Sequence, residues 1–160
     1  MINLKQLNEF LIKAKKAGYA SGNNAKKIKE KNKSKTITFK NGDWFYNDNY
    51  FGGEPYGGRE VVFFKDQPVY MMVYYGEVDA KIKIFKGVYK FLQEAITLVP
   101  KDKPFRGPKF YQNGDYAYRN WIHGEITNFS GVEKIYLGKK KIYEAKYMGG
   151  LVDQRKEIDG

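Results

Sequence analysis

The sequence of 160 residues contains no cysteine and a single histidine, His123. The lack of cysteine excludes a disulfide framework, a thiolate metal site and a cysteine nucleophile. One histidine excludes a metal site built on a histidine pair and gives little basis for a histidine-based catalytic triad. We therefore expect no metal ligands, no cofactor and no catalytic residue of a recognisable kind.

Long apolar runs and glycine-rich phosphate loops are also missing. No apolar stretch approaches the ~20 residues that span a bilayer, and the first residues lack the apolar segment of a signal peptide. We therefore expect a cytoplasmic protein without a membrane partner. The glycines at 52–58 precede a predicted strand instead of a helix, and no Gly-Lys-Ser/Thr occurs, so this segment does not fit a phosphate-binding loop.

Arginine is scarce although the net charge is +11. Only four arginines occur, and many of the lysines lie in the segment Lys26–Lys35. A basic loop attracts phosphate backbones or anionic surfaces, which makes weak nucleic-acid or anionic-surface binding through this loop one alternative function. A solvated loop is the other interpretation, and the shortage of the bidentate arginine fork favours it.

An internal repeat organises the chain. Residues 41–46 recur at 113–118, with an offset of 72, while residues 58–63 and 69–76 recur with an offset of 73. A helical pattern, Phe-Leu-x-x-Ala, occurs at the start of both copies, at Phe10 and at Phe91. The repeat predicts two similar halves, and a cleft between two halves is a natural place for a ligand.

Each copy predicts one helix followed by an antiparallel meander. Apolar residues recur every three or four positions from Leu4 to Ala14 and from Val88 to Val99, with Asn3, Gly18 and Pro100 as end signals. Aromatic residues make up 17% of the chain and favour strands in the remainder. The segments predicted to be irregular are 19–35 and 51–58.

The fold class expected is therefore α+β. Two tandem helix-plus-meander repeats, at about 4–77 and 85–150, would form a curved antiparallel sheet or half-barrel with two helices. They would make a single domain over residues 1–152, followed by a loose tail at 153–160.

Two glutamates stand out as candidate site residues. Glu60 and Glu133 each begin a row of alternate apolar residues in the strands predicted at 59–64 and 133–137. A buried carboxylate needs a partner or a raised pKa. The pair could line a ligand pocket or act in acid–base catalysis, or each glutamate could tie down a glycine-rich loop.

Tyrosines lie on one face of the strands that follow. They are Tyr70 and Tyr74 in the first copy and Tyr143 and Tyr147 in the second. Such rows line ligand clefts with ring and hydroxyl, or form sheet core. Arg119 is the arginine expected to bind an anion or to pair with a glutamate.

The opposite face of the strand at 69–75 is apolar in the first copy only. It carries Val69, Met71, Val73 and Tyr75. We therefore expect the sheet of the first copy to be covered on both sides, with a homodimer contact as the alternative.

Several motifs together resemble a family known only as a domain of unknown function. They include Tyr50-Phe51-Gly52-Gly53-Glu54, Gly58-Arg59-Glu60-Val61-Val62, Arg106-Gly107-Pro108 and Phe129-Ser130-Gly131-x-Glu133. The resemblance covers about residues 5–152 and implies a bacterial or archaeal family, some members of which follow an Xre-type helix-turn-helix domain. The residues before Leu4 are too few for such a domain here.

The function expected is binding of a small-molecule ligand between the two repeats. An enzyme using the Glu60/Glu133 pair is the first alternative, and binding through Lys26–Lys35 is the second.

Overall fold

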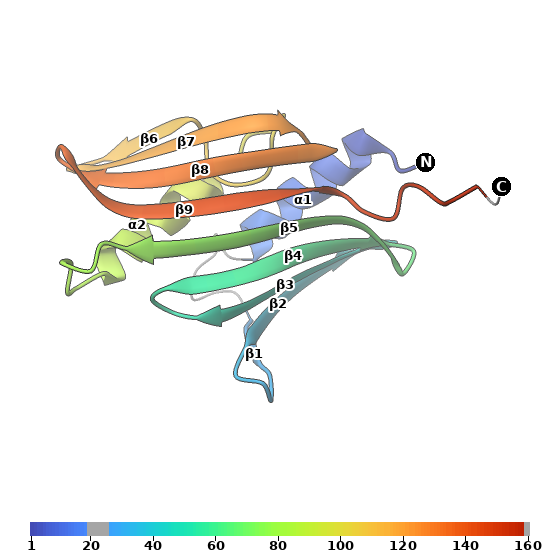
Figure 1. Ribbon diagram of the computed structural model, residues 1–160, viewed down its shortest axis with the longest axis horizontal. Helices are drawn as coiled ribbons and strands as arrows, with labels where there is room; N and C mark the ends of the chain where they lie inside the picture. The colour runs from blue at the N-terminus through green and yellow to red at the C-terminus, as the bar shows by residue number, and fades with distance from the viewer. Residues whose placement is uncertain (19–25, 159–160) are drawn as a thin grey trace.

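The computed structural model describes residues 1–18 and 26–158, which form an α+β fold (Figure 1). This part of the chain contains two helices and nine strands, and all the strands belong to one open antiparallel sheet. The elements are α1 (Leu4–Ala17), β1 (Ile28–Lys29), β2 (Lys35–Asn41), β3 (Trp44–Gly52), β4 (Tyr56–Phe64), β5 (Gln67–Val78), α2 (Lys86–Thr97), β6 (Phe110–Asn113), β7 (Tyr116–Glu125), β8 (Asn128–Leu137) and β9 (Lys140–Leu151). The predicted α+β class, antiparallel sheet and two helices are confirmed.

The strand order is β1-β2-β3-β4-β5-β9-β8-β7-β6. The first half of the chain, from α1 to β5, and the second half, from α2 to β9, meet where β5 pairs with β9, with Tyr74 opposite Tyr147. Both helices lie on the same face of the sheet, behind it in Figure 1. We call this helix-covered side the inner face and the other side the outer face.

Both helices form where the apolar periodicity predicts them. The side chain of Asn3 accepts a hydrogen bond from the backbone N–H of Gln6 (3.1 Å) and so caps the start of α1. Leu7 and Leu11 of α1 and Leu92 of α2 are fully buried against the inner face. The core therefore lies between the two helices and the sheet, and none of the described helices is long and apolar enough to cross a membrane.

Two segments expected to be irregular contain strands. In the basic segment, Ile28 pairs with Thr36, so β1 and β2 form a short hairpin; residues 19–25 of the predicted loop lie outside the described residues. In the glycine-rich segment, β3 continues to Gly52 and β4 begins at Tyr56. Pairing with strands on both sides compensates for the low strand propensity of the glycines in β4.

The prediction that the first half is covered on both sides is wrong. Val73 and Tyr75 of β5 are 41% and 58% exposed on the outer face. The reason is that both helices pack on the inner face, which leaves no described element to cover the outer one.

Candidate functional site

Glu60 and Glu133 are both buried on the inner face, and each is held by its own cation. Lys15 of α1 donates to both carboxylate oxygens of Glu60, at 2.8 and 2.7 Å. The Nε of Arg106, in the connection between α2 and β6, lies 3.1 Å from both oxygens of Glu133, and its Nη2 also donates to that carboxylate. Each charge is therefore compensated within the core, as a buried carboxylate requires.

Glu133 has additional partners in the second half. The hydroxyls of Tyr118 and Tyr143 donate to its two oxygens, at 2.6 and 3.0 Å. Tyr143 also forms a short hydroxyl–hydroxyl contact with Tyr56, which brings the first half into the same network. Burial lowers the pKa of Arg106, but the carboxylate of Glu133 and other neighbours raise that pKa by more than burial lowers it. The guanidinium therefore stays charged.

Asp48 is a third buried acid that the sequence analysis did not single out. It lies directly opposite Glu60 in the β3–β4 ladder and is 3% exposed. Tyr74 donates a hydrogen bond of 2.5 Å to its Oδ1. Burial, together with the negative charge of Glu60, raises the pKa of Asp48 to about 7. Asp48 therefore exchanges its proton near neutral pH, a property that clusters at functional sites.

Glycines make room for the tyrosines on the inner face. Gly58 pairs with Tyr74, and a Cβ on Gly58 would lie 2.7 Å from the Tyr74 hydroxyl. Gly131 pairs with Tyr147, and a Cβ there would lie 2.1 Å from the Tyr147 ring. Because glycine has no side chain, each ring can lie across the neighbouring strand, where its hydroxyl reaches Asp48 or Asn120.

A cavity of about 210 Å³ opens beside Asp48 and Tyr74. Its walls come from the first half and from α2 and the segment after it. The lining residues are Lys27, Lys35, Asp48, Tyr50, Gly52, Gly53, Tyr56, Tyr74, Tyr89, Gln93 and Arg106. The guanidinium of Arg106 lies 5.9 Å from the centre of the Tyr74 ring, so the polar groups of the two halves meet here. We call this space the inner cavity.

Glu54 ties α2 to the edge of the inner cavity. Its carboxylate accepts hydrogen bonds from the hydroxyl of Tyr89 and from the backbone N–H of Val78 (2.8 Å). The turn that carries Glu54, between β3 and β4, contains a cis Glu54–Pro55 peptide bond. These contacts fix the position of the helix that supplies part of the cavity wall.

The predicted site residues are distributed unevenly around the inner cavity. Tyr74 lines it, whereas Glu60 and Glu133 are buried in the core and are not among its lining residues. Tyr143 and Tyr147 are buried in the hydrogen-bonded network. The hydroxyl of Tyr70 is buried without a hydrogen-bond partner among the described residues.

Arg119 is not in this network. Its side chain is exposed, with its guanidinium 5.1 Å from the centre of the Phe110 ring. The arginine that pairs with a glutamate is Arg106. Alternation along β7 explains the difference, because Tyr118 and Asn120 face inward and Arg119 must face outward.

Sequence signals for the missed residues differ in strength. Asp48 lies two positions after Tyr46 in a strand, which places it on the same inner face and could have been recognised. Arg106 follows Pro104 in an irregular connection, where no periodicity indicates the direction of a side chain. Among the described residues, no three His, Asp or Glu side chains are grouped to hold a metal ion.

Helices on one side of an open antiparallel sheet, with two buried ion pairs in the core, define a two-layer α+β domain. The model of one protein family, described as Domain of unknown function (DUF5680), matches residues 48–152, well over half of the chain. The chain therefore belongs to this family, as the resemblance in its motifs indicates. No curated protein and no solved structure shows a significant match.

Proposed function

We propose that the protein binds a small polar ligand in the inner cavity, at the junction of its two halves. The observation that carries this proposal is the combination in one small space of an acid that titrates near pH 7, Asp48, with Lys27 and Lys35. Groups that converge on one concave space are the usual mark of a ligand site.

The ligand's chemistry follows from the walls of the cavity. A volume of 210 Å³ holds about seven water molecules at ~30 Å³ each, so the ligand is a small metabolite. Lys27 and Lys35 attract an anionic group, and Asp48 accepts a hydrogen bond when ionised or donates one when protonated. A small carboxylic acid or amino acid combines these features.

The sequence repeat is part of this proposal. Glu60 aligns with Glu133, Asp48 with Asn120 and Tyr74 with Tyr147, and each aligned pair occupies comparable surroundings. We infer that the halves are copies of one unit and that the first has acquired an acid, Asp48, where the second has an amide. This difference supports placing the ligand beside Asp48 and away from Asn120.

Binding is proposed in preference to catalysis. An enzyme would use Glu60 and Glu133 as its catalytic acids. These two carboxylates instead form ion pairs with Lys15 and Arg106 and do not line the cavity. The resemblance to a family some members of which follow an Xre-type helix-turn-helix domain supports the same choice, because that association would suit a sensory module that binds an effector.

A thermal-shift screen tests the proposal. The protein is heated with a panel of small carboxylic acids, amino acids and phosphorylated metabolites, because a ligand at a hundred times its Kd adds about 2.7 kcal/mol of stability. A shift that is lost in Lys35→Ala and in Tyr74→Phe but kept in Lys40→Ala supports the inner cavity. Lys40 is a matched control because it lies on the same strand, is exposed and does not line the cavity. If the panel gives no shift, or one that Lys35→Ala and Tyr74→Phe leave unchanged, the assignment is wrong.

A further inference from the structure

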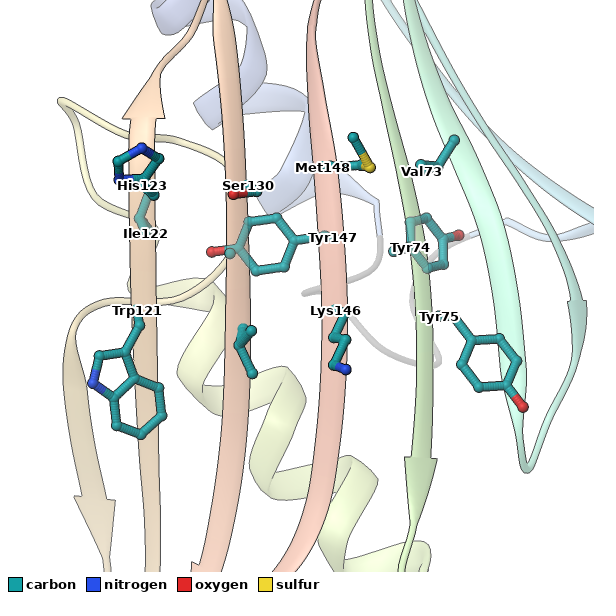
Figure 2. A pocket seen from close by; sticks show the side chains of 12 residues that line it. Val73, Tyr74, Tyr75, Trp121, Ile122, His123, Ser130, Lys146, Tyr147 and Met148 are labelled. Carbon is teal, nitrogen blue, oxygen red and sulfur yellow. The ribbon is translucent and has the colours of Figure 1, made fainter.

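Exposed side chains on the outer face form two rows across neighbouring strands (Figure 2). The pairing registers place Trp121, Val132, Lys146 and Tyr75 in one row. The second row consists of His123, Ser130, Met148 and Val73, and Arg59 of β4 continues it. Both rows cross from the second half of the chain to the first.

A hollow of about 700 Å³ lies over these rows. Trp121 and Tyr75, at the two ends of the first row, are 50% and 58% exposed. Their strands are three steps apart in the sheet, or roughly 14 Å at ~4.8 Å per step. Val132 and Lys146 lie between them in the row, so the two aromatic side chains stand at opposite ends of the hollow.

Cations surround the rings. The Lys134 ammonium lies 5.3 Å from the centre of the Trp121 ring, and Lys146 lies in the row between Trp121 and Tyr75. Arg59 and Arg119 are exposed beside the rows, so this face carries two of the chain's four arginines. The acids Glu144 and Glu77 lie opposite each other at one edge, where Glu144 is paired with Lys141 (2.7 Å) and lies 4.0 Å from the Lys134 ammonium. The two rows themselves contain the cations Lys146 and Arg59 and no acid.

We propose that this outer face binds single-stranded nucleic acid. Single strands are recognised on exposed antiparallel sheets by aromatic rings that stack on bases and by cations that follow the phosphates. Here the side chains of Trp121 and Tyr75 are half exposed, and Lys134, which lies over the Trp121 ring, and Lys146 lie beside them. The site is on the opposite side of the sheet from the inner cavity and does not depend on it.

Two other occupants fit the face less well. A second copy of the chain in a two-fold contact would bury Lys146, Lys134 and Arg59 of both copies in one interface, where like charges repel. An anionic lipid surface would favour a continuous apolar patch, whereas His123, Ser130 and Lys146 alternate with the apolar side chains. The cations and the two separated aromatic rings on this face favour single-stranded nucleic acid over these two occupants.

Intrinsic fluorescence provides a direct test because the chain has only two tryptophans. Trp44 packs in the core against Phe10 and Phe64, so the variant Trp44→Phe leaves Trp121 as the reporter. This variant is titrated with oligo-dT and oligo-U of about 12 nucleotides, within the usual site size. We expect quenching of Trp121 at low salt, with an affinity that falls linearly on a log–log plot against salt concentration.

Single substitutions, read by fluorescence anisotropy of a labelled oligonucleotide, locate the site. Tyr75→Ala and Trp121→Ala should each weaken binding at least fivefold, because each loses a stacked base. Trp121→Phe should retain most of the affinity, and Lys146→Ala should reduce the salt slope by about one. The control Lys90→Ala, on the exposed side of α2, should not change the affinity of either oligonucleotide beyond a small electrostatic loss.

Several results would overturn the proposal. One is the absence of quenching at low salt by either oligonucleotide. A second is an equal loss of affinity in Lys90→Ala and Lys146→Ala with no effect of Tyr75→Ala, which would indicate diffuse charge attraction. A third is quenching by phosphatidylserine vesicles and not by oligonucleotides. A fourth is quenching by an increase in protein concentration alone, with a dimer in sedimentation, which would assign the face to a second copy.

Discussion

Asp48 and Glu60 lie opposite each other on β3 and β4, two carboxyl groups side by side in the core. Lys15 holds Glu60 with two hydrogen bonds, and Tyr74 donates to Asp48. Because one ammonium serves two adjacent acids, the carboxyl without the cation retains its proton to a higher pH. Asp48, which has no ammonium bound to it, is therefore the carboxyl of this pair whose pKa is raised.

The first prediction concerns the pH dependence of stability. Burial and the charge of Glu60 raise the pKa of Asp48 from 3.8 to about 7, so between these values the folded protein holds a proton that the unfolded chain has released. The free energy of unfolding therefore falls as the pH rises from about 4 to about 7. Asp48→Asn should remove this component, which is on the order of a few kcal/mol.

Urea unfolding at several pH values measures this effect as the difference between the wild-type protein and Asp48→Asn. The asparagine oxygen can still accept the hydrogen bond from Tyr74, which makes the variant a matched one. A difference that does not change between pH 4 and pH 7 would show that Asp48 titrates at its ordinary value.

The second prediction concerns the buried pair of Lys15 and Glu60. Lys15→Met should destabilise the fold by about 3–5 kcal/mol, because it leaves the carboxylate of Glu60 in the core without its cation. Adding Glu60→Gln should recover much of that loss, because the amide carries no charge. A double-mutant cycle by urea unfolding measures the coupling. If the two losses simply add, the pair contributes little to stability.

Much of this architecture could be predicted from the sequence. Apolar periodicity located α1 and α2, and alternation put Glu60 and Glu133 on the buried side of their strands, because both patterns follow directly from backbone geometry. The pairing of β5 with β9, in contrast, depends on tertiary packing between distant segments. The partners of the two glutamates were missed for the same reason, since Lys15 and Arg106 come from elements far away in the sequence.

The third prediction compares two tyrosines that the repeat aligns. The hydroxyl of Tyr143 donates to Glu133, whereas the hydroxyl of Tyr70 is buried without a hydrogen-bond partner among the described residues. Tyr143→Phe should therefore cost about 1–3 kcal/mol, because the hydrogen bond is to a charged group. Tyr70→Phe should be neutral or stabilising, because it removes a buried hydroxyl that has no hydrogen-bond partner among the described residues.

Thermal and urea unfolding of the two variants give the comparison, and each substitution removes a single oxygen atom. Equal losses in Tyr70→Phe and Tyr143→Phe would show that the Tyr70 hydroxyl has a partner of similar value. The aligned positions would then be equivalent in energy as well as in sequence.

The fourth prediction concerns the glycine beneath the Tyr147 ring. Gly131→Ala would place a Cβ 2.1 Å from that ring, which must rotate away and so lose the 2.6 Å hydrogen bond from its hydroxyl to Asn120. We expect a loss of about 1–3 kcal/mol in the free energy of unfolding, typical of overpacking in a core. Gly53→Ala is the control, because a Cβ there meets nothing within 4 Å. If both alanine variants unfold at the same urea concentration as the wild-type protein, the close approach of ring and strand is not needed for stability. If Gly131→Ala is destabilised and Gly53→Ala is not, the missing side chain at Gly131 provides the space into which the Tyr147 ring packs.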